Sequence, residues 1–314
     1  MNAPKDLNRP GVATRFLRDL RRDCETHPAT NHLFLARCAV TPYTREDYAT
    51  YAAQHFPLVA VFTRYLENLL LRGPDSESKH WLAKVLVDEY GEGSEGRDHA
   101  DLYRGFMRAA GAQDPLEHPA VLVPEVADFL RTHLTLTARA PFLVGLGAVG
   151  PGHEWSIPHM FELLIEGLRL AGFKDDEIGY FTLHIAQDED HGAWLEEAIA
   201  RSAETAEGRD QIHRGAMLSL EARYRFWGGI QRVVGRWRSP AAHLHLPQRL
   251  RERCVGLLSR VREKAPLGLL DGLHYRHALT LHDVLALAPS LVVPVEYRSG
   301  AQKAQEAPRS PLAS

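Results

Sequence analysis

The chain has 314 residues, of which 45% are hydrophobic and 25% are charged, and its formal net charge is −3. This composition is typical of a folded globular protein and excludes collagen-like and intrinsically disordered chains. The 37 basic and 40 acidic residues lack the basic excess of a dedicated nucleic-acid-binding protein.

The three cysteines, Cys24, Cys38 and Cys254, are too few and too widely spaced for a disulfide framework. We expect buried thiols and a reducing compartment, the cytoplasm. No stretch approaches 18 uninterrupted apolar residues, and the N-terminus has no apolar signal region. The sequence therefore predicts no membrane span and no secretion.

Helical periodicity runs from about residue 12 to residue 237. Thr44 followed by Asp47 predicts a capping box at the start of a long amphipathic helix that ends near Gly73. Further helices are predicted over residues 78–91, 97–111, 126–139, 154–170 and 211–237, and another begins near Asp175. No sustained alternation typical of strands occurs. We predict an all-α bundle of about seven helices with short connections.

After Trp237 the character of the sequence changes. Residues 231–264 contain nine Lys or Arg and two Glu, a net charge of +7. This segment either packs on the bundle with a solvated basic face or docks on an anionic partner. We divide the chain into a domain of residues 1–237, a basic and apolar extension of residues 238–298, and a disordered tail of residues 299–314.

The segment YFTLHIAQDEDHGAWLEEAI is the most informative for chemistry. His184, Asp188 and His191 recur at i, i+4 and i+7, so they share one face of a helix. The same face carries Phe181 and Leu195, which indicates that it faces the core. Because buried unpaired charges are expensive, these groups must either satisfy one another or hold a cation. Three ligand-type residues on an inward face favour a metal ion.

A second candidate segment is DEYGEGSEGRDH. Glu89 lies near the end of one predicted helix and His99 opens the next, with Gly91 between them. Helical spacing would instead pair Glu92 with His99, but the glycines make an uninterrupted helix costly. Taken alone, the segment is equally compatible with a glycine turn that carries surface acids.

The third segment is GHEWSIPHMFELLIEGL. Glu154 shares a helix face with the apolar residues Phe161 and Leu168, which places its carboxylate inward. Pro158 cannot donate to the Glu154 carbonyl and is expected to kink this helix beside the carboxylate. A glutamate in a first helical turn usually lies in water, so its role as a ligand depends on the other two segments.

Together the three segments supply three carboxylates and three imidazoles from separate helices: Glu89, His99, Glu154, His184, Asp188 and His191. Two ferrous ions would nearly balance the carboxylate charge in a buried site. Mixed nitrogen and oxygen donors without thiolate suit iron or manganese better than structural zinc. The chain has one DxxH motif and no second copy, which disfavours a ferritin-like fold.

With these residues the chain resembles the haem-oxygenase-like diiron oxidases and oxygenases. The resemblance covers roughly residues 15–235. It rests on NHLFLARCAVTPYTREDYATYAAQHFPLVAVF, DEYGEG…H, the E-x3-P segment at Glu154 and H-x3-D-x2-H. It implies a haem-oxygenase-like helical bundle and assigns all six residues as iron ligands. Some members add a carboxylate from the preceding long helix, for which Glu67 is the nearest candidate. By itself, Glu67 is more typical of a surface acid on an amphipathic helix.

The resemblance also implies a function: a non-haem diiron oxidoreductase that uses two Fe2+ ions, or Mn, and O2 to oxidise a small amine, amino acid or fatty-acid-like substrate in biosynthesis. N-oxygenation, desaturation and oxidative C–C cleavage all remain open as outcomes. So do an external electron donor and a homodimer. His55, His153, Trp155, Phe161 and Phe181 are candidates for pocket lining or for hydrogen bonds to the ligands, and each is also compatible with plain packing.

Two other interpretations stay open at this point. One is a metal-independent enzyme of the same fold, like the thiaminases and pyrroloquinoline-quinone synthases. The other is a non-catalytic protein whose basic C-terminal segment docks on a partner.

Overall fold

The structure is a computed structural model that describes residues 11–40, 42–115, 117–234, 249–250 and 252–253. Over these residues the chain forms α-helices and short 3₁₀ turns without a β-strand, which confirms the predicted all-α class. The α-helices are α1 (Val12–Thr26), α2 (Leu33–Val40), α3 (Arg45–Arg72), α4 (Ser76–Glu89), α5 (His99–Ala110), α6 (Pro124–Arg139), α7 (Phe142–Val149), α8 (Ile157–Leu170), α9 (Gly179–Ala200) and α10 (Ala206–Val233). The 3₁₀ turns are η1 (Glu92–Ser94), η2 (Glu154–Ser156) and η3 (Ser202–Glu204).

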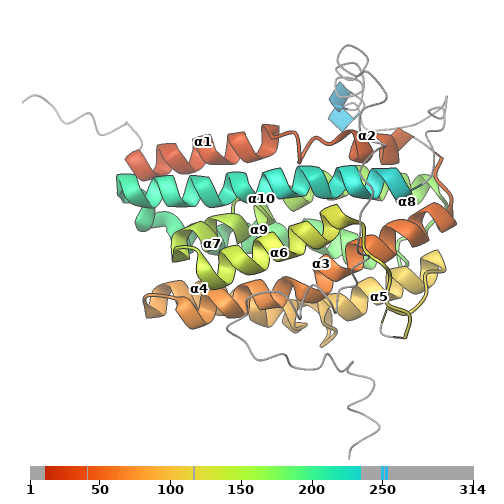
Figure 1. The fold of residues 1–314 in the computed structure, drawn as a ribbon, viewed down its shortest axis with the longest axis horizontal. Coiled ribbons are helices and arrows are strands. Elements are labelled where there is room, and N and C mark those ends of the chain that lie inside the picture. Colours follow the sequence, from red (N-terminus) through yellow and green to blue (C-terminus); the bar gives the residue numbers. More distant parts are fainter. Residues whose placement is uncertain (1–10, 41, 116, 235–248, 251, 254–314) are drawn as a thin grey trace, which may run out of the picture.

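The helices run along the long axis of a single bundle (Figure 1). One edge carries α1 and α2 end to end, and the opposite edge carries α4 and α5 end to end. The predicted capping box starts α3, because Thr44 accepts a hydrogen bond from the Asp47 backbone N–H and Asp47 accepts one from the Thr44 N–H. The seven predicted helices correspond to α3–α6 and α8–α10, and the structure adds α1, α2 and α7.

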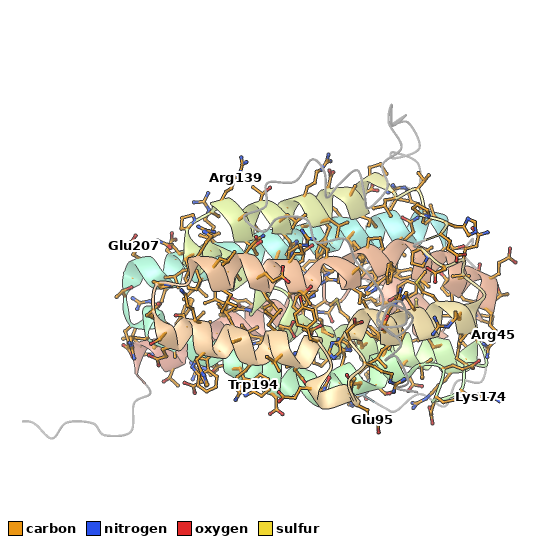
Figure 2. The ribbon with its side chains drawn as sticks, turned by 90° about the horizontal axis from the view of Figure 1, so that it is seen from below. Arg45, Glu95, Arg139, Lys174, Trp194 and Glu207 are labelled. Carbon is orange, nitrogen blue, oxygen red and sulfur yellow. The ribbon has the colours of Figure 1, made fainter. Side chains whose placement is uncertain are left out.

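The chain leaves helical geometry between α4 and α5 and again between α7 and α8, and candidate site residues lie at both breaks. Between α4 and α5, Gly91 adopts φ +107°, where a Cβ would lie within 2.9 Å of the backbone of Gly96 and Arg97. Only glycine fits there, so α4 must end at Glu89. Figure 2 shows Glu95, in this break, between Arg45 at one end of the bundle and Glu207 at the other. Glu89 ends the helix before this break, and His99 begins the helix after it.

The second break lies between α7 and α8, and here the predicted kink is wrong. Residues 154–156 form the turn η2, and α8 begins at Ile157 with Pro158 in its first turn. A proline in that turn needs no N–H and costs the helix nothing. Pro158 therefore starts a helix and does not bend one. Glu154 stands just ahead of that helix, and its side chain is buried as predicted.

Cys24 and Cys38 are buried free thiols, as expected, whereas Cys254 lies outside the described residues. Nearly all of the predicted extension 238–298 and the whole tail 299–314 also lie outside them. Within the basic segment, Arg253 donates to the backbone oxygens of Thr30 and His159, both at 2.9 Å, and Arg249 pairs with Glu162. These contacts favour packing on the bundle for that part of the segment. None of the helices described is both long and apolar enough to span a bilayer.

Candidate metal centre

Five of the six predicted ligands come together in the interior. Glu89 ends α4, His99 begins α5, Glu154 opens η2, and His184 and His191 lie on α9. Each of these side chains is at most 5% exposed. Helix α9 contacts α4 and α5 on one side of the cluster and η2 and α8 on the other. The two breaks and this one continuous helix therefore supply all five side chains.

Glu89 lies between the other groups. Its Oε2 is 2.9 Å from His99 Nδ1, and its Oε1 is 3.8 Å from His191 Nδ1. His191 Nδ1 is also 3.6 Å from Glu154 Oε2. One ligand atom from each of Glu89, His99 and His184 fits within 4.8 Å of the other two. The two oxygens of Glu89 therefore face two different imidazoles, an arrangement suited to a bridging carboxylate.

The remaining predicted acids have different positions. The backbone of Asp188 lies in α9 between the two histidines, but its side chain is outside the described set. Glu67 accepts a hydrogen bond from the Tyr90 hydroxyl at 2.6 Å near the surface, and Glu92 is exposed. Neither Glu67 nor Glu92 belongs to the group of atoms around Glu89.

Two hydrogen bonds orient the imidazoles from outside the cluster. The buried carboxylate of Asp88 lies 2.7 Å from His191 Nε2, which leaves Nδ1 facing Glu89 and Glu154. His184 Nδ1 lies 2.7 Å from the Tyr180 backbone oxygen, so this nitrogen carries the proton and Nε2 presents a lone pair. Fixing one ring nitrogen in this way is how proteins hold histidine ligands for a metal.

Two opposing effects set the pKa values in the cluster: burial disfavours the charged form of each group, and neighbouring opposite charges favour it. Burial disfavours charged His191, but the Asp88 carboxylate, followed by Glu154 and Glu89, raises the pKa of His191 to about 11. Burial and neighbouring His99 lower the pKa of His184 to about 3. Burial raises the pKa of Glu154, whereas at Glu89 the attraction of His99 outweighs burial and lowers the pKa. A charged His191 thus offsets part of the charge of the neighbouring carboxylates.

Several nitrogen atoms in the cluster have no hydrogen-bond partner outside it. Nε2 of His99 is buried without a hydrogen-bond partner, and Nδ1 of His99 and Nδ1 of His191 have only carboxylate oxygens of the cluster beside them. Buried polar atoms without partners are costly and rare in native proteins. Nitrogen and carboxylate donors without thiolate fit iron or manganese. The donor set therefore fits the divalent ions that the sequence predicts.

A narrow internal cavity of about 20 Å³, room for about one water molecule, adjoins the cluster. Glu89, Glu154 and His184 line it. Of the predicted pocket residues, His55, His153 and Phe161 also line it. Trp155 and Phe181 do not.

Those two residues pack elsewhere in the core. Trp155 donates from Nε1 to the Gly192 backbone oxygen at 3.1 Å and is covered by Arg21. Phe181 packs edge-on against Phe106, with ring centroids 4.9 Å apart.

Sequence reasoning missed Asp88 and Arg223, the second of which also lines the cavity. Arg223 could have been found from the pattern of α10. It shares a buried stripe with Ala216, Ser219, Leu220 and Ile230, and an arginine in an apolar stripe is unusual. Asp88 gave no such signal, because its partner His191 is 103 positions away.

Comparison with known proteins shows related sequences and folds. The chain is 28% identical over 199 residues to a 4-aminobenzoate synthase of Nitrosomonas europaea, a match that covers 60% of this chain and 79% of the relative. Among solved structures it resembles a CADD-like protein of unknown function from Nostoc punctiforme, with a TM-score of 0.61, 16% identity, and coverage of 71% of this chain and 99% of that one.

Two further structures share the fold. A domain with a haem oxygenase-like fold from Shewanella denitrificans has a TM-score of 0.59 at 13% identity and covers 73% of this chain and 94% of that one. A TenA homologue from Pseudomonas syringae has a TM-score of 0.57 at 14% identity, with coverage of 74% and 99%. The predicted haem-oxygenase-like fold is confirmed. Residues 49–224, more than half of the chain, match the family described as iron-containing redox enzymes, and the chain belongs to that family.

Proposed function

We propose that this protein is an O2-dependent non-haem diiron oxidase that oxidises a small molecule in a biosynthetic pathway. The carrying observation is the buried cluster of Glu89, Glu154, His99, His184 and His191, in which carboxylate oxygens and imidazole nitrogens face one another and Nε2 of His99 has no hydrogen-bond partner. The similarity to a protein named 4-aminobenzoate synthase supports a biosynthetic role. Membership of an iron-containing redox family supports iron over other metals.

Glu89, His99, Glu154, His184 and His191 would hold the ions, with Asp188 as a further ligand. When bound, a pair of Fe(II) ions supplies the electrons that reduce O2. The described chain contributes orientation, since Asp88 and the Tyr180 carbonyl fix the two rings on α9. It also excludes bulk water, because every described ligand is buried.

A metal-independent enzyme is the second candidate, since a TenA homologue shares the fold. That likeness, at 14% identity, concerns the fold alone. A metal-free mechanism leaves Nε2 of His99 buried without a partner, whereas metal ligation would use this nitrogen. The diiron proposal is therefore the stronger one.

The test is O2 uptake by the full-length protein loaded with Fe(II) under anaerobic conditions and then mixed with O2. We expect uptake by the wild type, loss of uptake in Glu89→Gln, and wild-type uptake in Glu92→Gln, an exposed glutamate three positions away. Uptake that is equal in wild type and Glu89→Gln, or absent from iron-loaded wild type, would contradict the proposal.

A further inference from the structure

Arg223 of α10 is a buried cation without a buried anion paired to it. Arg223 is 2% exposed. Among the described residues no carboxylate lies within ion-pair distance of it, and Glu154, whose charge acts on it from farther away, is a candidate metal ligand. One Nη donates to His153 Nδ1 at 2.8 Å, and the guanidinium lies 4.6 Å from the centre of the Phe129 ring. Its Nε is buried without a hydrogen-bond partner. A guanidinium has five N–H donors, so most of its capacity is uncommitted to described protein groups.

This guanidinium lines the same cavity as the metal donors. Glu89, Glu154, His184 and Arg223 all line it. The rest of the lining is mainly apolar or aromatic, and includes Leu58, Val59, Phe62, Ile157 and Phe161. The cavity thus combines one positive group, an apolar wall and the candidate metal centre.

Burial of this kind is expensive unless a ligand compensates it. Burial lowers the pKa of Arg223 to about 10, which still leaves the group charged at neutral pH. A charge taken out of water without a partner costs several kcal/mol. The nearby carboxylates of the cluster would be committed to metal ions. An anion that enters the cavity from outside can supply the missing partner, and carboxylates match the planar guanidinium fork.

We propose that Arg223 is the recognition group for the carboxylate of the substrate, which is an organic acid with an apolar body. This inference rests on the proposed function, because it places that carboxylate in the cavity beside the metal donors. The cavity, about 20 Å³ in this structure, must widen between its apolar side chains to admit the body of the acid. His153 is then a positioning residue. A guanidinium can only donate, so Nδ1 of His153 accepts the hydrogen bond from Arg223 and orients the guanidinium.

The experiment compares an acid with its uncharged amide. Hexanoate and hexanamide are titrated by calorimetry into full-length protein loaded anaerobically with Fe(II), and the iron content of each sample is measured. Benzoate and benzamide form a second pair with an aromatic body. We expect the wild type to prefer each acid over its amide by about tenfold or more, because a charge-assisted hydrogen bond is lost in the amide.

Three variants make the test specific. Arg223→Gln should lose the preference for the acids, and Arg223→Lys should keep part of it. Arg225→Gln removes an exposed arginine from the same helix and should behave as wild type. If Arg223→Gln does not fold, as judged by circular dichroism, the reduced preference of Arg223→Lys decides the matter.

Two results would overturn the inference. One is a wild type that binds neither acid, or that binds each acid and its amide equally. The other is a preference that persists in both Arg223 variants, which would locate the carboxylate on another group, iron included. Because iron content is measured separately, loss of acid recognition with intact iron binding rejects this inference alone. Absence of iron rejects the proposed function.

Discussion

Asp88 Oδ2 and His191 Nε2 lie 2.7 Å apart, although 103 positions separate them in the sequence. Asp88 precedes Glu89 on α4, and His191 follows Asp188 on α9. The contact turns Nδ1 of His191 toward Glu89 and Glu154. The last turn of α4 thus supplies both a candidate ligand and the group that orients another one.

Replacing Asp88 with asparagine should weaken metal binding. The amide keeps the size of the side chain but removes the charge that holds the His191 ring. Loss of such an orienting partner typically costs about 10–100-fold in metal affinity. Anaerobic Fe(II) titration of Asp88→Asn measures this loss, with Asp190→Asn, an exposed acid on α9, as the control. Equal affinity of Asp88→Asn and wild type would show that the contact does not orient a ligand.

Divalent metal should stabilise the folded protein. A ligand at 100 times its Kd adds about 2.7 kcal/mol, which raises Tm by several degrees for a chain of this size. We expect Mn(II), or Fe(II) under anaerobic conditions, to give this rise in the wild type and in His213→Ala, an exposed histidine on α10. His99→Ala, which removes a buried donor, should show little of it. A rise of the same size in His99→Ala would place the metal elsewhere.

Gly215 should be essential to the contact between α10 and α7. A Cβ at this position would collide with the Val144 backbone oxygen and lie 2.9 Å from the Ala148 nitrogen. We expect Gly215→Ala to lower the free energy of unfolding by about 1–3 kcal/mol, as overpacking does. Gly228→Ala on the same helix meets nothing within 4 Å and should be neutral or stabilising by up to about 1 kcal/mol. Urea unfolding measures both, and equal effects would contradict the account.

His133 should make the folded state sensitive to acid. Its Nδ1 donates to the Phe129 oxygen at 2.9 Å and its Nε2 lies 2.8 Å from the Ser219 hydroxyl, so the buried ring is neutral. Burial lowers its pKa from 6.5 to about 3. The unfolded chain therefore binds a proton that the folded chain excludes. Its contribution to stability is complete above pH 6.5 and is lost as the pH falls toward 3.

The slope of stability against pH tests this effect. One such histidine contributes at most about 1.4 kcal/mol per pH unit. We expect His133→Gln to have a shallower slope than wild type between about pH 4 and 6, whereas the exposed control His213→Gln keeps the wild-type slope. Parallel slopes in all three proteins would show that His133 is not the titrating group.

The sequence predicts helices well where polar and apolar residues alternate with helical period. The stripe on α9 and the capping box of Thr44 and Asp47 both follow from local spacing. Helix α7 does not, because its sequence FLVGLGAV is apolar throughout and has no polar face to show a period. Pro158 was misplaced for a related reason, since a proline inside a helix and one in its first turn look alike until the start of the helix is known.

The site residues that could be predicted are those marked by the local sequence. Glu89, His99 and Glu154 stand at breaks that glycine and proline reveal, and the α9 histidines share an inward face. Asp88 and Arg223 depend on which helices become neighbours, which the spacing of residues along one helix does not encode. Trp155 shows the converse, because a residue beside a candidate ligand along the chain points elsewhere and bonds Gly192.

The most direct test of the account is the iron stoichiometry of the full-length protein. Fe(II) is titrated anaerobically, excess metal is removed, and bound iron is measured per chain. We predict two iron ions per chain in the wild type and in Glu92→Gln, and fewer in Glu89→Gln and His184→Ala. A wild type that retains no iron, or variants that retain as much as the wild type, would contradict a metal centre built from these buried residues.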